Sequence, residues 1–201
     1  MYVYGSGRCG ICNLRGRTHE IHETSRSRFR LMQFFAEMST SVAGGHISVT
    51  GATAHNFMMG LLICGSNILV AASGNNDTKP FIIAAAARKR YIHCVRAPIP
   101  MTTRSDLQVT VAQVQNCQAP GGSGPGYCAA PKLISGAIAR GFHRSTDVSR
   151  WAMSEIMFQP STDRRTINLA RGQLVYDHGL SQPSCPTCEK LIPVLMCGFR
   201  A

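Results

Sequence analysis

Three cysteines carry the clearest chemical signal in the sequence. Cys185 and Cys188 are separated by two residues, and at the start of a helix this spacing places both sulfurs on one face, where a tetrahedral metal ion can take both. Cys128, far upstream, supplies a third sulfur. Three protein ligands leave one coordination position open, which is typical of catalytic zinc. The sequence therefore predicts a catalytic Zn²⁺ site.

All three cysteines are expected at helix N-termini. After Cys128, apolar residues recur at helical spacing over 133–138, and Gly141 ends the run. The second helix is expected to begin at Pro186, a favoured first helical residue, and Pro193 must kink or shorten it. The exposed N–H groups and the macrodipole at such positions favour thiolate over thiol.

A second group of metal-ligating residues lies near the N-terminus. Cys9, Cys12, His19 and His22 follow a Cys-x2-Cys-x6-His-x2-His pattern, whose ligand types and number suit a closed structural zinc site. The linker is shorter than in a zinc finger. The alternative is that these are ordinary loop residues and that each histidine forms a solvated pair with the glutamate after it.

The residues around the downstream cysteines resemble those of nucleotide and nucleic-acid deaminases. These enzymes carry (His/Cys)-x-Glu at the start of one helix and Pro-Cys-x-x-Cys at the start of another. The matching stretches here are Cys128-Ala129-Ala130 and Cys185-Pro186-Thr187-Cys188. Their surroundings are most similar to the deaminase domains of bacterial polymorphic toxins. The resemblance extends over residues 55–197.

Ala130 departs from the family pattern. It replaces the glutamate that, in these enzymes, shuttles protons between the zinc-bound water and the base. The resemblance therefore implies a nearly inert chain, either an inactivated variant of a toxic enzyme or a natural non-catalytic relative. Ser184 in place of proline is a milder departure. Glu155 is the nearest carboxylate that could substitute, but nothing in the sequence fixes it on the zinc.

The resemblance also implies a fold and a division of the chain. The expected fold is α/β, a three-layer α/β/α sandwich with a mixed sheet, similar to that of the cytidine deaminases. Residues 51–201 would form the deaminase core. Residues 1–50 would form an N-terminal extension that holds the second candidate zinc site and the first helix.

Apolar periodicity predicts the main elements directly. The run over 107–115 alternates weakly and fits either a strand or a helix. The clearer elements are a helix over 25–43, strands over 57–64 and 67–73 joined by a turn at Gly65-Ser66, a helix from Pro80 to Arg90, a short strand over 91–95 and a strand over 151–158.

Four residues are candidates for substrate contact. Several deaminases place an asparagine just beyond the second hairpin strand to hold the substrate's sugar, and Asn75 matches that place, with Asn76 next to it. A plain turn explains the same composition. His55 lies in a loop that could approach the site. Trp151 could stack on a base, although the only tryptophan of a domain is more often in the core.

The charge balance indicates a polyanionic partner. Lys and Arg number 21 against 10 Asp and Glu, which gives a net charge of +11. Together with the resemblance, this implies hydrolytic deamination of cytosine to uracil in DNA rather than RNA, in a single strand or at a flipped-out base. The alternatives are a zinc-stabilised nucleic-acid-binding module without chemistry, and an RNA or nucleotide deaminase.

Location is inferred from simple patterns. The N-terminus lacks a secretory signal, and no apolar run is long enough to span a bilayer, so no membrane partner is expected. Reduced thiols at the site of action favour the cytoplasm. If the domain belongs to a larger secreted toxin, its delivery signals lie outside these residues. An immunity protein is then a further candidate partner.

Overall fold

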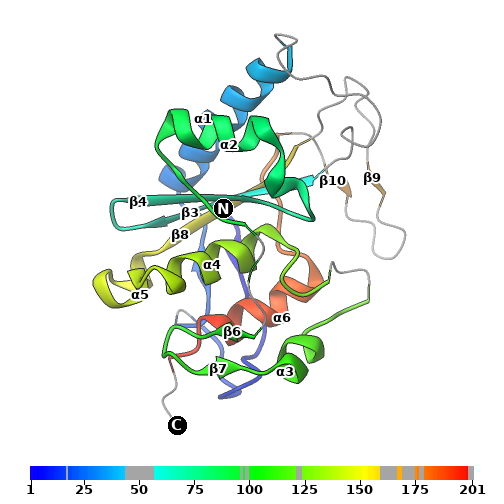
Figure 1. The fold of residues 1–201 in the computed structure, drawn as a ribbon. Helices are drawn as coiled ribbons and strands as arrows, with labels where there is room; N and C mark the ends of the chain where they lie inside the picture. Colours follow the sequence, from blue (N-terminus) through cyan, green and yellow to red (C-terminus); the bar gives the residue numbers. More distant parts are fainter. Residues whose placement is uncertain are drawn as a thin grey trace.

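The computed structural model describes residues 1–16, 18–43, 57–95, 97, 100–120, 124–158, 167–168, 175–176 and 179–198. These residues form a mixed α/β fold built on a six-stranded sheet (Figure 1). With η for a 3-10 helix, the elements in chain order are β1 (Val3–Tyr4), β2 (Ile21–His22), α1 (Ser25–Ala43), β3 (Phe57–Cys64), β4 (Asn67–Ala72), η2 (Asn76–Thr78), α2 (Pro80–Lys89), β5 (Ile92–His93), β6 (Met101–Thr102), β7 (Gln108–Val109), α3 (Val111–Asn116), α4 (Ala129–Ala139), α5 (Phe142–Ser145), η3 (Val148–Arg150), β8 (Ala152–Phe158), β9 (Ile167–Asn168), β10 (Val175–Tyr176) and α6 (Pro186–Leu195).

The main sheet has the strand order β1-β2-β8-β3-β4-β5. Its centre is β3, which pairs antiparallel with both β4 and β8, while β2 runs parallel to β8 and β5 parallel to β4. The β3–β4 hairpin turns at Gly65, whose φ of +63° is accessible to glycine at little cost. The sheet is therefore mixed, as expected.

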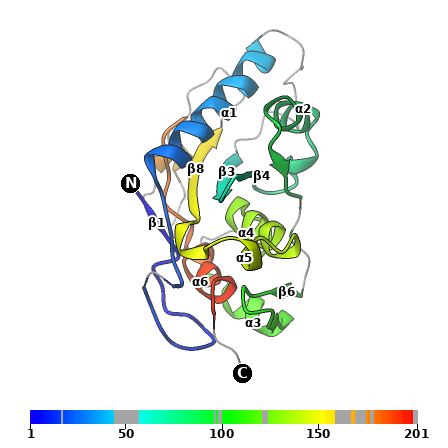
Figure 2. The same ribbon diagram turned by 90° about the vertical axis from the view of Figure 1, so that its left-hand side faces the viewer.

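Helices cover both faces of this sheet. Figure 2 shows α1 and α2 on one side of the strands and α4 and α6 on the other. Successive β3 side chains point to opposite faces, so Leu61 and Ile63 join the core under α1 and α2, whereas Leu62 and Cys64 join the core under α4 and α6. Because both faces are buried, β3 is apolar along its whole length.

The elements expected from periodicity are largely confirmed. The helix over 25–43, both hairpin strands, the helix from Pro80 and the strand before residue 158 are present, with ends within one residue of those expected. The expected strand over 91–95 is reduced to β5. The ambiguous run over 107–115 contains both β7 and the start of α3, because Thr110 and Gln113 form a reciprocal capping box that begins a helix there.

The N-terminal residues are part of the main sheet. β1 pairs with β2, and β2 lies parallel to β8 through the pairing of His22 with Ala152. In addition, α1 packs on β8 and β3. Residues 1–50, which were expected as an extension, thus supply two strands to the sheet that also contains strands from 51–201.

Two features bring α4 close to the sheet. Gly60 on β3 faces the start of this helix, and a Cβ added there would lie 2.8 Å from Leu133 Cδ1 and 3.1 Å from Ala129 Cβ. A glycine at this position therefore lets the first turns of α4 approach β3. The second feature is the buried side chain of Lys132.

Lys132 ties α4 to the chain that follows β4. Its Nζ donates hydrogen bonds to the carbonyl oxygens of Ala72 (2.7 Å) and Gly74 (2.6 Å) and pairs with Asp77 Oδ2 at 3.1 Å. The Lys132 side chain is wholly buried and Asp77 nearly so. A buried charge is tolerated only when paired and hydrogen-bonded, so these three contacts fix the helix against the end of β4.

We expect Lys132→Met to destabilise the protein strongly, because it leaves Asp77 and two carbonyl groups buried without their partner. The free energy of unfolding should fall by about 3–5 kcal/mol, the usual cost of removing one member of a buried pair. Urea unfolding followed by circular dichroism measures this. Lys190→Met, on the exposed side of α6, is the control and should change stability by about 0.5 kcal/mol or less. Equal stability of the two variants would contradict the assignment.

Candidate metal centre

The sulfurs of Cys128, Cys185 and Cys188 converge and are called the three-cysteine site here. All three Sγ atoms lie within 4.8 Å of one another, and those of Cys128 and Cys185 are 3.4 Å apart. Cys128 is the N-cap of α4, Cys185 is the N-cap of α6 and Cys188 lies in the first turn of α6. The expected placement of the cysteines at helix N-termini is confirmed.

Local sequence explains how these helices begin. Cys128 and Cys185 both have extended backbone conformations, with ψ of 157° and 159°, as N-cap residues do. Pro186 follows at the first helical position, where its fixed φ suits a helix and its missing N–H is not needed. Because α4 and α6 pack against each other on one face of the sheet, their N-termini bring the sulfurs together.

The crowded sulfurs need a cation to ionise together. The hydrogen bond with Cys185, followed by burial, raises the pKa of the Cys128 thiol to about 12, and contacts with both other sulfurs raise the pKa of Cys188. The helix dipoles alone therefore do not produce three thiolates. A divalent cation reverses this balance by attracting each sulfur's negative charge.

The donor set fits zinc. Thiolate ligands select soft or borderline metals, and zinc–sulfur bonds of about 2.3 Å in a tetrahedron place the sulfurs about 3.8 Å apart. The observed spacing needs only small side-chain adjustments to reach that value. Cys128, Cys185 and Cys188 would hold the ion, with one coordination position left for a ligand from outside the chain.

A buried carboxylate lies beside the three-cysteine site. Glu155, on β8, is 3% exposed, and the backbone N–H of Ala130 donates a hydrogen bond to its side chain. Burial, and then the nearby Cys185 sulfur, raise the pKa of this carboxyl to about 8. Its antiparallel partner on β3 is Gly60. Sequence reasoning gave no ground for placing Glu155 here, since the alignment of β8 with α4 is a tertiary contact.

The loop after β4 is fastened next to Cys128. The N–H of Gly74 donates to the carbonyl oxygen of Tyr127 at 2.8 Å, and Lys132 holds the same loop from below. Asn76 Nδ2 donates to the Ser73 carbonyl oxygen at 2.7 Å and so serves the turn itself. The side chain of Asn75 is exposed on this loop. Of the two neighbouring asparagines, Asn75 is the one whose side chain faces solvent.

Of the two other candidates for substrate contact, the structure describes only Trp151. Trp151 is 3% exposed in the core, where its Nε1 donates to Thr146 Oγ1 at 2.8 Å. This burial corrects the expectation that Trp151 stacks on a base. His55 lies outside the described residues.

A second group of ligand atoms forms at the N-terminus, with one change from the expected set. Cys9, Cys12 and His19 come together with Cys197, and these four residues are called the N-terminal cluster here. His22 is not part of it, because its ring lies on β2, half-exposed and 3.6 Å from Glu20. Proximity in sequence suggested His22, whereas the fold brings in Cys197 from beyond α6.

Hydrogen bonds favour ionisation of one thiol in the N-terminal cluster. Burial opposes ionisation of Cys12, but hydrogen bonds from the Leu14 N–H and from the Cys9 and Cys197 thiols outweigh it and lower its pKa. Two separate Cys/His groups among the described residues are thus close enough to hold metal ions.

Comparison with protein-family models, with curated proteins and with solved structures gave no match for the chain. The functional argument therefore depends on the geometry of the site. No helix in the described part of the chain combines the length and the apolar character needed for a bilayer crossing.

We expect Cys185→Ser to lose the metal of the three-cysteine site, because two sulfurs bind zinc much more weakly than three. Elemental analysis of purified protein should show one zinc fewer per chain than in the unchanged protein. Cys64→Ala, a buried thiol outside both groups, is the matched control and should keep the full zinc content. Unchanged zinc content in Cys185→Ser would contradict the three-cysteine site as a metal centre.

Proposed function

We propose that the protein is a zinc-dependent hydrolytic deaminase that acts on cytosine in nucleic acid, with Glu155 as its proton-transfer group. The observation that carries this proposal is the buried Glu155 carboxylate, hydrogen-bonded to the Ala130 N–H beside the three-cysteine site. Ala130 removes the family's glutamate from α4. Glu155 supplies a carboxylate to the same region from β8.

The chemistry divides between the metal and the protein. Zinc bound by three sulfurs would act as a Lewis acid that activates water near neutral pH. Glu155 has the position that general acid–base work requires, because its buried carboxyl lies beside the proposed metal ligands, where it could accept and return a proton. The Ala130 N–H orients the carboxylate. On this account the chain does not need the missing glutamate to be active.

Several features support a base as substrate. Asn75 is exposed on a loop fastened beside Cys128, at the place where the resemblance puts a contact to the substrate's sugar. The helices that carry the cysteines lie on one face of a mixed sheet that contains an antiparallel hairpin, which supports a cytidine deaminase-like sandwich. A base within a duplex cannot reach such a site, so the substrate is single-stranded or flipped out.

A nucleic-acid partner is supported by the charge of +11, and the preference for DNA over RNA comes from the resemblance alone. Thiolate ligands require reduced cysteines, which favours action in the cytoplasm. The second candidate function is a zinc-stabilised nucleic-acid-binding module without chemistry. Ala130 is the observation that favours it, because an inactivated chain would retain the thiols and the charge.

We expect Glu155→Gln to lower cytosine deamination by about 10²- to 10⁴-fold while zinc content stays unchanged, because the amide cannot transfer protons. Sequencing of mixed DNA and RNA after incubation with the protein measures C-to-U conversion. Glu37→Gln, on the opposite face of the sheet, is the matched control and should keep full activity.

Ala130→Glu distinguishes the remaining possibilities. If it restores activity in the Glu155→Gln background, a carboxylate at either place serves the reaction. If Ala130→Glu deaminates cytosine and the protein without this substitution does not, Glu155 is not the base, and Ala130 is what makes the protein inactive. If the unchanged chain and Ala130→Glu both hold zinc and neither deaminates cytosine in DNA, RNA or nucleotides, the binding-module function takes the place of the enzyme.

We expect binding to a single-stranded oligonucleotide to weaken steeply with salt. If about five phosphates are engaged, the logarithm of the binding constant should fall by several units per tenfold rise in salt. Fluorescence anisotropy at increasing NaCl measures this slope, and binding of free CMP is the control for a single phosphate. A flat response would instead favour a free-nucleotide substrate.

A further inference from the structure

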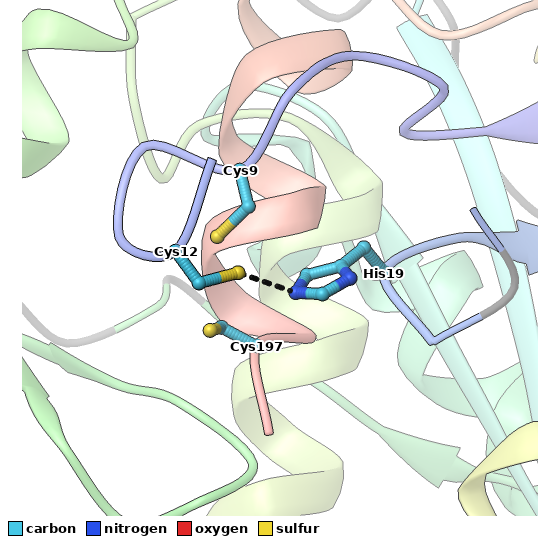
Figure 3. Close-up of side chains that lie close together, drawn as sticks. All are labelled: Cys9, Cys12, His19 and Cys197. Atoms are coloured by element: carbon cyan, nitrogen blue, oxygen red, sulfur yellow. Dashed lines mark hydrogen bonds between the residues drawn. The ribbon is translucent and has the colours of Figure 1, made fainter. Parts of the chain in front are cut away.

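We propose that Cys9, Cys12, His19 and Cys197 bind a second zinc ion, in a closed structural site that fastens the N-terminal loop to the C-terminal end of α6. Figure 3 shows the four side chains converging beside that end of the helix. The inference does not depend on the proposed deaminase activity, because the cluster is separate from the three-cysteine site.

The ligand atoms are already close enough for one ion. The three sulfurs and a ring nitrogen all lie within 4.8 Å of one another, and Cys12 Sγ is 3.1 Å from His19 Nε2. Three cysteines and one histidine form a complete tetrahedral donor set of the kind found in structural zinc sites. With four protein ligands, no position remains open for water or substrate.

The loop that carries Cys9 and Cys12 is shaped to present both sulfurs. The Cys9 N–H donates to the Leu14 carbonyl oxygen and the Asn13 N–H to the Cys9 carbonyl oxygen, each at 2.9 Å. Asn13 has a φ of +59°, the left-handed conformation that asparagine tolerates. The Ile11 N–H points at Cys9 Sγ at 3.4 Å, so a backbone donor faces the sulfur, as a thiolate ligand requires.

Neighbouring groups orient His19 and Cys197 and offset the negative charge of the ligand set. His19 Nδ1 forms a hydrogen bond of 2.9 Å with Thr18 Oγ1, which leaves Nε2 directed at the sulfurs, as expected for a metal-ligating histidine. Three thiolates and one Zn²⁺ carry a net charge of −1. The Arg104 guanidinium packs against Gly198, next to Cys197, and is positioned to offset that charge. Cys197 is held by Ser105 Oγ, which donates to its carbonyl oxygen at 3.1 Å.

The site links two distant parts of the chain across one helix. α6 begins with the three-cysteine site, and Cys197 follows two residues after its end. The N-terminal segment also contacts the same helix at Glu189, which accepts hydrogen bonds from the Ser6 N–H (2.9 Å) and Ser6 Oγ (2.7 Å). A zinc ion at the N-terminal cluster would thus secure the far end of the helix that positions Cys185 and Cys188.

Zinc stoichiometry tests this inference directly. We expect two zinc ions per chain in the unchanged protein, one in Cys197→Ser and two in His22→Ala. His22→Ala is the matched control, since it removes the histidine that sequence spacing alone would choose. A content of one ion per chain in the unchanged protein, lost in Cys185→Ser, would overturn the proposal.

X-ray absorption at the zinc edge on Cys185→Ser covers the case in which Cys197→Ser does not fold. That variant keeps the N-terminal cluster intact and should retain one zinc, bound by three sulfurs and one imidazole, whose outer-shell scattering is distinctive. A spectrum without imidazole would refute the ligand set. A mass lower by two hydrogen atoms per disulfide, with the bond mapped within the N-terminal cluster, would refute the metal site in favour of an oxidised pair of cysteines.

Discussion

The meeting of two helix N-termini over one face of the sheet is the constraint on which the rest of the structure depends. Sulfurs this close and this buried would repel one another as thiolates, so all three can ionise together only if a cation binds between them. Neither helix can be displaced without separating the three sulfurs. Specific contacts hold both helices: Gly60 and the buried Lys132 for α4, and exposed hydrogen bonds between Glu189 and the N-terminal segment for α6.

The same packing explains how a carboxylate can approach the three-cysteine site from a different element. α4 lies against β3, and a side chain from the neighbouring strand β8 reaches the helix's first turn, which is where Glu155 meets the Ala130 N–H. The backbone of Glu155 is fixed on both sides: it pairs with Gly60 on β3, its N–H donates to the Tyr4 hydroxyl, and its carbonyl oxygen accepts from the Gln182 N–H. Burial raises the pKa of the Glu155 carboxyl, because it removes water from around the charged form.

Sequence patterns predicted the helices, the strands and the helix-start positions of three cysteines well, and the tertiary contacts poorly. The Cys-x-x-Cys spacing, the helical run after Cys128 and the alternation of the hairpin are local features, and they appear as expected. Lys132 and Cys197 were not assigned, and Glu155 was named only as a carboxylate that nothing in the sequence fixes on the zinc, because each acts through a residue more than 20 positions away. A lysine within an otherwise apolar run was the available signal for Lys132, since such a charge is buried only with partners. The choice of His22 failed because spacing ignores direction: β2 turns that ring outward.

The pairing of Cys9 with Cys197 has a consequence for how the molecule is assembled. These residues enclose nearly every helix and strand between them, so their contact closes a very long loop, and contacts of such sequence separation form late and slowly. During synthesis on the ribosome, Cys9 and Cys12 emerge long before their last partner. Until Cys197 is synthesised, the thiols of Cys9 and Cys12 can form disulfides with other cysteines of the same chain, such as Cys64, Cys94 and Cys117. A chaperone, or a metal ion bound early, would have to prevent such mispaired intermediates.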